Sequence, residues 1–219
     1  MNRILVVAAH PDDEVLGCGA TIAKHVQNMD EVQVLFLADG FSSRTDLCAS
    51  RHQAASQAAN FLGCCVPIFL NFPDNQLDAI PLLEIVKKIE ATIQDFRPNI
   101  IYTHHIGDLN IDHQVSHRAT LTACRPQPNF CVKEIYSFEV PSATHWQSFS
   151  MGKVFNPNYF IDIANVLARK MQALEYYEDE MHQYPHARSV EAVESLAKFR
   201  GSIVGIRQAE AFVVERLLK

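Results

Sequence analysis

Runs of consecutive apolar residues alternate along this chain with segments whose apolar residues recur every three or four positions. The runs are rich in β-branched residues and unbroken in hydrophobicity, which is typical of strands buried on both faces. They predict five strands, at 3–10, 31–39, 65–72, 99–105 and 132–138. The periodic segments predict helices at 17–28, at 46–62, from Pro81 to shortly before Pro98, and at 112–123.

The pattern changes after residue 140. Residues 141–158 have the composition of a loop and contain Trp146, the only tryptophan. Residues 162–180 and 190–207 are predicted to form two helices, and the tail at 210–218 is compatible with a strand or a docked helix.

Regular alternation of strands and helices predicts βαβ units, and these build a parallel sheet covered by helices on both faces. The fold class is therefore α/β, a Rossmann-like three-layer sandwich with a mostly parallel sheet and additional C-terminal helices. The length of 219 residues fits a single domain. We expect residues 1–140 to form its core and residues 141–219 to supply a substrate-side loop and the C-terminal helices.

Two unusually polar segments directly follow predicted strands. The first is His10-Pro11-Asp12-Asp13-Glu14, and the second is the stretch THHIGDLNIDHQVSH at 103–117. In a sheet of order 3-2-1-4-5, the first and fourth strands are neighbours, and ligands bind at the carboxyl ends of such strands. We therefore expect the two segments to meet in one crevice.

Imidazoles and carboxylates that converge at one point suit Zn²⁺ or another divalent first-row metal. A dication would also offset the repulsion between the adjacent carboxylates. The alternative is a simple turn in which Asp12 or Asp13 caps the next helix. A dinucleotide site is a poor fit, although GCGATIA follows the first strand. The acidic residues occupy the place where a pyrophosphate would bind, and a third glycine is missing at the required spacing.

Composition narrows the function further. The net charge is −6 and no Lys/Arg cluster is present, which argues against nucleic-acid binding. No apolar run is long enough to span a bilayer. Met1 leads directly into a strand and leaves no room for a signal peptide, so we expect a cytoplasmic protein whose six cysteines are reduced thiols.

The stretches AHPDDEVLGCGATIA and THHIGDLNIDHQ together resemble the PIG-L/LmbE-like family of metal-dependent N-acetylglucosaminide deacetylases. RHQAASQAANFLG at 51–63 resembles a further family pattern, although Gln53 and Ala54 stand where an acid is often found. The resemblance covers about the first 140 residues well and the C-terminal helices loosely. It implies a Rossmann-like fold and a hydrolase that releases acetate from an N-acetylated amino sugar, a small-molecule substrate.

Carried over residue by residue, the resemblance implies that His10, Asp13 and His113 hold Zn²⁺, with Fe²⁺ as an alternative, and that Asp12 is the general base. Many relatives carry a histidine three residues before the second metal-binding histidine, whereas this chain has Asn110. Asparagine donates a hydrogen bond but does not exchange protons near neutral pH. Either Asn110 is a neutral oxyanion donor, or His104, His105 or another residue takes the role.

Three further residues are candidates for substrate binding. Arg51 matches a family arginine that contacts the substrate or braces the site. Asp74 follows the third strand and could bind sugar hydroxyls or form a turn, and Trp146 could stack on a sugar or pack its own loop. Another small N-acyl substrate, a non-catalytic sugar-binding module and a homo-oligomeric state all remain open at this point.

Overall fold

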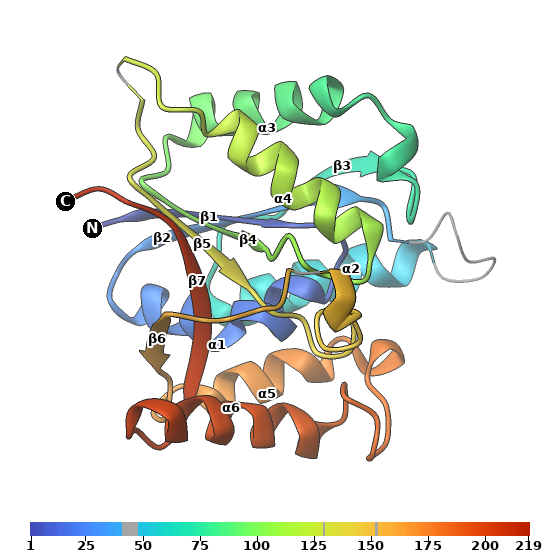
Figure 1. Ribbon diagram of the computed structural model, residues 1–219, viewed down its shortest axis with the longest axis vertical. Coiled ribbons are helices and arrows are strands. Elements are labelled where there is room, and N and C mark those ends of the chain that lie inside the picture. The colour runs from blue at the N-terminus through green and yellow to red at the C-terminus, as the bar shows by residue number, and fades with distance from the viewer. Residues whose placement is uncertain (41–47, 129, 152) are drawn as a thin grey trace.

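Figure 1 shows the computed structural model, which describes residues 1–40, 48–128, 130–151 and 153–219. In these residues, seven strands form one sheet in the order β3-β2-β1-β4-β5-β7-β6. The strands are β1 (Arg3–Ala8), β2 (Glu31–Ala38), β3 (Ile68–Phe72), β4 (Ile100–His104), β5 (Glu134–Phe138), β6 (Tyr159–Asp162) and β7 (Ala209–Leu217). The helices are α1 (Asp13–Gln27), α2 (Cys48–Leu62), α3 (Leu82–Phe96), α4 (Ile111–Ala123), α5 (Leu167–Glu175) and α6 (Val190–Val204), with short 3-10 helices at Leu77–Ala79, Phe149–Met151 and Glu178–Glu180.

The first five strands are parallel and confirm the predicted order 3-2-1-4-5. Strand β1 lies between β2 and β4, with Ile4 opposite Val32 on one side and Ile100 on the other. The carboxyl ends of β1 and β4 are therefore adjacent, as the convergence of the two polar segments requires.

The C-terminal part departs from the predicted pattern. Strand β7 pairs antiparallel with both β5 and β6, so the tail is a strand, one of the two alternatives. The predicted helix at 162–180 is too long, because α5 covers only Leu167–Glu175 and β6 ends at Asp162. The four residues of β6 are half-buried or exposed at the sheet edge, and so short a strand leaves no clear apolar pattern.

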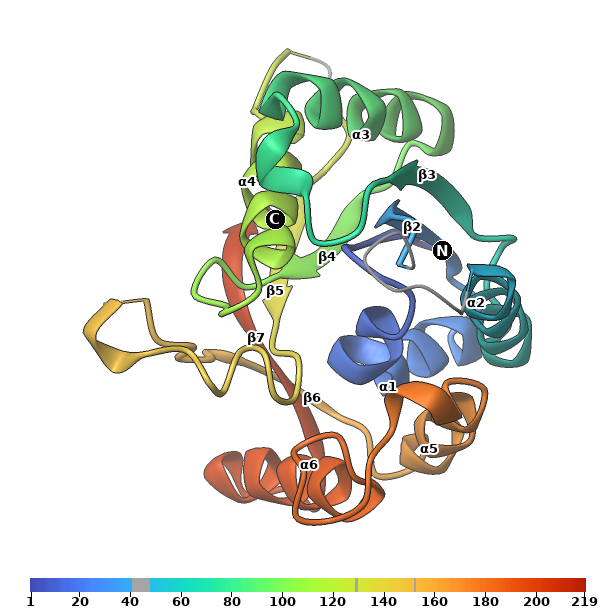
Figure 2. The same cartoon turned by 90° about the vertical axis from the view of Figure 1, so that its right-hand side faces the viewer.

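Helices cover both faces of the sheet (Figures 1 and 2). Alternate side chains of β1 divide between two hydrophobic clusters, which is why its sequence is apolar without interruption. Ile4, Val6 and Ala8 lie in the cluster packed by α1, α2, α5 and α6, while Leu5 and Val7 lie in the cluster packed by α3 and α4. All five side chains are fully buried.

Helix α1 begins at Asp13 rather than at the predicted residue 17, because its first turn is part of the polar run. Its helical geometry is interrupted at Cys18, where φ is −146°. Helix α2 is described from Cys48, and the predicted start at residue 46 lies outside the described residues. Within the described part of the chain, no helix has the length and apolar character needed to cross a bilayer.

Candidate metal centre

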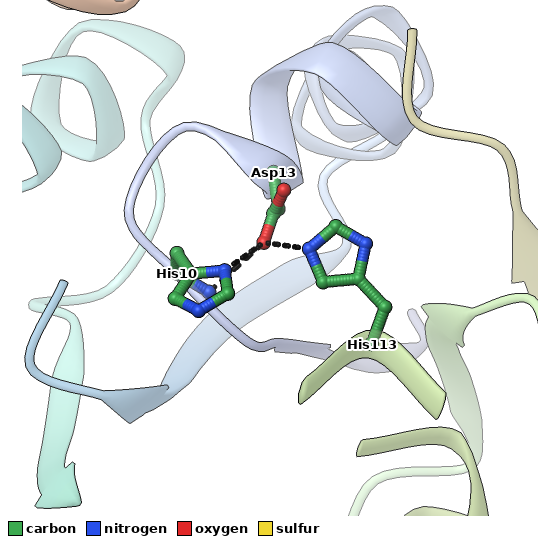
Figure 3. A group of neighbouring side chains, drawn as sticks. All are labelled: His10, Asp13 and His113. Atoms are coloured by element: carbon green, nitrogen blue, oxygen red, sulfur yellow. Dashed lines mark hydrogen bonds and ion pairs between the residues drawn. The ribbon is translucent and has the colours of Figure 1, made fainter. Parts of the chain in front are cut away.

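The site forms where the loops that follow β1 and β4 meet at the carboxyl edge of the sheet. His10 stands just after β1, Asp13 opens α1, and His113 lies in the first turn of α4 (Figure 3). His10 Nδ1 and His113 Nε2 each lie 3.2 Å from Asp13 Oδ2, and all three side chains are buried. The sequence prediction that these three residues come together is met by this geometry.

The second nitrogen of each of these two imidazoles faces carboxylates. His10 Nε2 lies 3.0 Å from Asp112 Oδ2 and 3.1 Å from Asp74 Oδ1, and His113 Nδ1 lies 3.1 Å from Asp108 Oδ2. An outer carboxylate of this kind fixes the tautomer of a metal-binding histidine and raises its basicity. Both rings are thus oriented to present one nitrogen to the space beside Asp13.

The donor atoms fit a metal ion. His10, Asp13 and His113 each offer one ligand atom, and these atoms lie within 4.8 Å of one another. Asp13 Oδ1 is buried and has no hydrogen-bond partner among the described residues, which is costly for a carboxylate oxygen unless a ligand satisfies it. Two imidazoles and one carboxylate with room for a further ligand are the donor set of catalytic zinc sites.

Two other groups of side chains have similar spacing but fit less well. In the group of His104, Asp108 and His113, His104 Nε2 already accepts a hydrogen bond from the Ala9 amide at 2.8 Å. In the group of His10, Asp74 and Asp112, the backbone amides of residues 75 and 77 already donate to the two oxygens of Asp112. Hydrogen bonds to the protein thus already use atoms of these two groups, although His104 Nδ1 is buried and has no partner among the described residues.

The charges of the cluster favour a cation. Burial alone would lower the pKa of His10, but the neighbouring carboxylates outweigh it and raise that pKa well above its usual value. Burial likewise opposes the charged form of His113, yet Asp13 and Asp108 raise its pKa to about 9. Burial would raise the pKa of Asp13, but His113 and His104 hold it well below the usual range. A dication would take the place of the protons on the two rings.

Asp12 lies beside this cluster in an unusual backbone conformation, with φ of 114°. Its carboxylate is buried, and Arg188 Nη1 donates to Oδ2 at 2.8 Å. Burial raises the pKa of Asp12 to about 6, against the opposing effect of Arg188. The structure therefore places the predicted general base next to the predicted metal ligands, in contact with a cation.

Arg51 is buried and braces the site instead of lying on the surface. Its guanidinium donates to the backbone carbonyls of Gly40 and Pro11 and pairs with Glu180 at 3.2 Å. These contacts tie α2 to the two loops that follow β1 and β2. Of the two roles considered for Arg51, bracing is the one that its contacts support.

Asn110 and His105 are both near the site but are engaged elsewhere. Asn110 caps α4 by accepting a hydrogen bond from the Asp112 amide at 2.8 Å, and its amide nitrogen lies 3.3 Å from Asn75 Oδ1. His105 Nδ1 accepts from the Gly107 amide at 3.1 Å, and its ring meets Phe155 edge-on. His104 stacks on His113 with ring centroids 3.9 Å apart, so of the histidine pair it is His104 that touches the cluster.

The remaining predicted residues occupy two different places. Asp74 lies in the cluster, where it contacts His10 at 3.1 Å. Trp146 is 57% exposed in the loop after β5, and its ring meets His186 edge-on at 5.5 Å.

Two residues in contact with Asp12 or its partners were not predicted from the sequence, namely Arg188 and Glu180. They follow α5, more than 160 positions after Asp12, and Glu180 pairs with both Arg51 and Arg188. Neither belongs to a recognisable motif. The one sequence signal is the clustering of charges in a segment already predicted to lie outside the core, which does not indicate where that segment packs.

Comparison with known proteins adds independent information. A family model described as PIG-L, GlcNAc-PI de-N-acetylase, matches residues 5–124. The chain is 34% identical over 157 residues to the uncharacterized deacetylase YaiS of Escherichia coli K12, covering 69% of this chain and 80% of that protein. It is 26% identical over 230 residues to the diacetylchitobiose deacetylase of Thermococcus kodakarensis, covering 96% of this chain and 82% of that one. The structure of N,N'-diacetylchitobiose deacetylase from Pyrococcus horikoshii matches with a TM-score of 0.81 at 21% identity, covering 98% of this chain and 84% of that one, and confirms the fold.

Proposed function

This chain belongs to the PIG-L family, and we propose that it is a zinc-dependent hydrolase that removes the acetyl group from an N-acetylated amino sugar. The observation that carries the proposal is the convergence of His10 Nδ1, Asp13 and His113 Nε2 beside the carboxylate of Asp12. The names of the relatives, which include deacetylases of diacetylchitobiose, support an amino sugar as the substrate class.

His10, Asp13 and His113 would hold the metal. A bound Zn²⁺ supplies two things, a lowered pKa of about 7 for a coordinated water and polarisation of a carbonyl oxygen. The carboxylates of Asp112 and Asp108 lie 3.0 and 3.1 Å from the ring nitrogens that face away from Asp13, and they would favour the tautomers that a metal requires.

Asp12 provides the acid–base chemistry. Its carboxylate accepts a proton from the attacking water as the C–O bond to the acetamide carbon forms. The same carboxyl group then returns the proton to the nitrogen as the C–N bond breaks, so that acetate and a free amine leave. Such proton transfer by a positioned side chain contributes about 10²–10⁴-fold to the rate. Burial suits the Asp12 carboxyl group to both proton transfers, because it raises the pKa of that group to about 6.

Substrate binding involves the mouth of the site. Asp74 is buried against His10, Asn110 lies at the start of α4, and the 57% exposed Trp146 offers its ring to a sugar. Asn110 can donate a neutral hydrogen bond after rotation of its amide, but it cannot exchange a proton there.

The test combines metal analysis with acetate release. The protein is stripped with a chelator, reloaded with Zn²⁺ or Fe²⁺, and assayed on N-acetylglucosamine, diacetylchitobiose, N-acetylglucosaminides, an N-acetylated sugar nucleotide and N-acetylated amino acids. We expect metal-dependent acetate release from at least one amino sugar. The matched control is Asp12→Asn, which should bind the same amount of metal and lose about 10²–10⁴-fold in kcat.

Three outcomes would contradict the proposal. Turnover of N-acetylated amino acids alone would indicate an amidohydrolase with another substrate. Sugar binding without acetate release would indicate a non-catalytic module. Full activity after removal of the metal would exclude the metal-dependent mechanism.

A further inference from the structure

Arg188 donates a side-chain hydrogen bond to the carboxylate of Asp12 at 2.8 Å, shorter than the 3.7 Å approach of Arg51. We propose that Arg188 is a positioning residue, which holds Asp12 Oδ2 in place and thereby leaves Oδ1 as the oxygen that takes up the proton. This inference rests on the proposed function, because it names the residue that orients the proposed base.

The guanidinium of Arg188 is held at two points. Nη1 donates to Asp12 Oδ2 at 2.8 Å, and Nε donates to Ser142 Oγ at 3.1 Å. Two hydrogen bonds from one planar group fix the orientation of that plane. Glu180 lies 3.8 Å from Nη1 and adds a second carboxylate on the same cation. Arg188 is therefore anchored independently of any substrate.

The backbone around Arg188 is fixed as well. Its amide donates to His186 Nδ1 at 3.1 Å, and the next residue, Ser189, is buried and caps α6 by accepting from the Ala192 amide. The arginine thus projects from the ordered start of a helix, which limits the positions that its side chain can reach.

Arg51, the other cation near Asp12, donates no hydrogen bond to the Asp12 carboxylate. Its Nη2 atom lies 3.7 Å from Asp12 Oδ1, too far for a hydrogen bond, and donates instead to the Pro11 carbonyl at 3.0 Å. Asp12 Oδ1 consequently accepts no hydrogen bond from the described residues. The two oxygens of Asp12 are therefore unequal, since one is paired with a guanidinium and the other keeps its lone pairs available.

Asp12 needs such external support because its own backbone provides little. A φ of 114° is unfavourable for a residue with a Cβ atom, and it places Asp12 outside the helix that begins at the next residue. The Asp12 amide donates to Glu14 Oε2 at 3.1 Å, which fixes the main chain but not the carboxylate. Arg188 is the described residue that fixes the carboxylate itself.

The experiment measures kcat, KM and bound metal for Arg188→Gln and Arg188→Lys, with Arg207→Gln as a matched control on an exposed arginine. Displacement of a catalytic group by about 1 Å costs on the order of 10²-fold. We expect Arg188→Gln to lower kcat by about 10–100-fold with KM within about threefold and metal content unchanged. Arg188→Lys or added guanidine should restore part of kcat, and Arg207→Gln should match the wild type.

A double-mutant cycle separates positioning from a structural role. If Arg188 acts through Asp12, Arg188→Gln should cause no further loss in an Asp12→Asn background. Additive losses, a change in KM alone, a loss of metal or an unchanged kcat would each overturn the proposal.

A crystal structure of Arg188→Gln keeps this test distinct from that of the proposed function. If the wild type releases no acetate from any substrate, the proposed function fails, but the positioning claim can still be judged. We expect the Asp12 carboxylate to rotate or become disordered in the variant. An unmoved carboxylate would overturn the claim whatever the activity.

Discussion

Two buried charged clusters contact helix α1, and they differ in how completely their charged atoms are hydrogen-bonded. In the first, Lys170 on α5 pairs with Glu210 on β7 at 2.7 Å. The ammonium also donates to the Leu16 carbonyl, and the Glu210 oxygens accept from the Ala20 and Thr21 amides. These amides follow the interruption of α1 at Cys18, so this cluster repairs a broken helix.

The second cluster is the candidate metal centre, and there the partner set is incomplete. Asp13 Oδ1, His104 Nδ1 and His113 Nδ1 are buried and have no hydrogen bond within the described residues. An unsatisfied buried polar atom costs about 1–3 kcal/mol, so it persists where function requires it. In the first cluster every charged atom has a partner, although the Thr21 hydroxyl has none among the described residues. The comparison indicates that a cluster whose charged atoms are all bonded stabilises the fold, whereas the candidate metal centre has buried ligand atoms left for a metal.

The largest expected effect is on the incomplete cluster. Asp13→Asn removes the carboxylate that both His10 and His113 face, while keeping its shape. Metal polarisation is worth several kcal/mol, so we expect kcat/KM to fall by at least ~10³-fold together with the loss of bound metal. Elemental analysis and acetate release measure both. Retention of stoichiometric metal by this variant would contradict this comparison, because the carboxylate of Asp13 would then not be needed to hold the metal.

The complete cluster should respond in stability instead. Lys170→Met leaves the Glu210 carboxylate buried without its cation, and breaking such a pair costs about 3–5 kcal/mol. Urea unfolding measures the loss, and metal content in the folded protein should not change. Lys198→Met is the control, because its ion pair with Glu194 is exposed and worth no more than about 0.5 kcal/mol. Equal losses in the two variants would contradict this interpretation.

The position of the candidate metal centre could be predicted from the sequence. Strand β1 is apolar after Arg3, strand β4 is buried throughout, and a parallel sheet of order 3-2-1-4-5 brings their carboxyl ends together. That reasoning placed His10 beside His113, although 103 positions separate them. The family resemblance is what assigns Asp13 as the expected ligand and Asp12 as the expected base, because spacing alone does not distinguish them.

Features that depend on packing at a distance could not be predicted. The contact of Arg188 with Asp12 depends on how the segment before α6 folds back over α1, and no local pattern encodes that. Strand β6 was missed because its four residues are half-buried or exposed at an edge. Asn110 was considered for its chemistry, but the structure uses its side chain to cap α4, a role that any helix start can require.

A third prediction concerns Glu14, a buried carboxyl between the two clusters. Burial raises its pKa to about 8, although a hydrogen bond from Tyr177 opposes the shift. The folded protein therefore keeps this proton at pH values where the unfolded chain has lost it, and stability falls as pH rises from about 5 to 8. At about 1.4 kcal/mol per pKa unit, Glu14→Gln should remove roughly 3 kcal/mol of that decline.

Chemical unfolding of the metal-free protein at several pH values tests whether stability falls as pH rises. The chelator must stay present, because a bound dication would lower the pKa of nearby carboxyl groups. Parallel pH curves for the wild type and Glu14→Gln would show that Glu14 ionises alike in the folded and unfolded chains.

The smallest expected effect is on metal affinity, when a carboxylate that faces a metal-binding ring is substituted instead of a metal ligand. Asp108 Oδ2 lies 3.1 Å from His113 Nδ1 and accepts a hydrogen bond from the Thr144 hydroxyl at 2.7 Å, so it faces the ring on the side away from Asp13. Loss of such a partner typically weakens metal binding about 10–100-fold, and we expect this range for Asp108→Asn in a chelator competition assay. Thr144→Val removes a neutral donor and should weaken binding less. If Asp108→Asn bound metal as tightly as the wild type, the orientation of His113 would come from its stacking on His104. Asp108 would then contribute nothing to metal binding, although its carboxylate faces the ring.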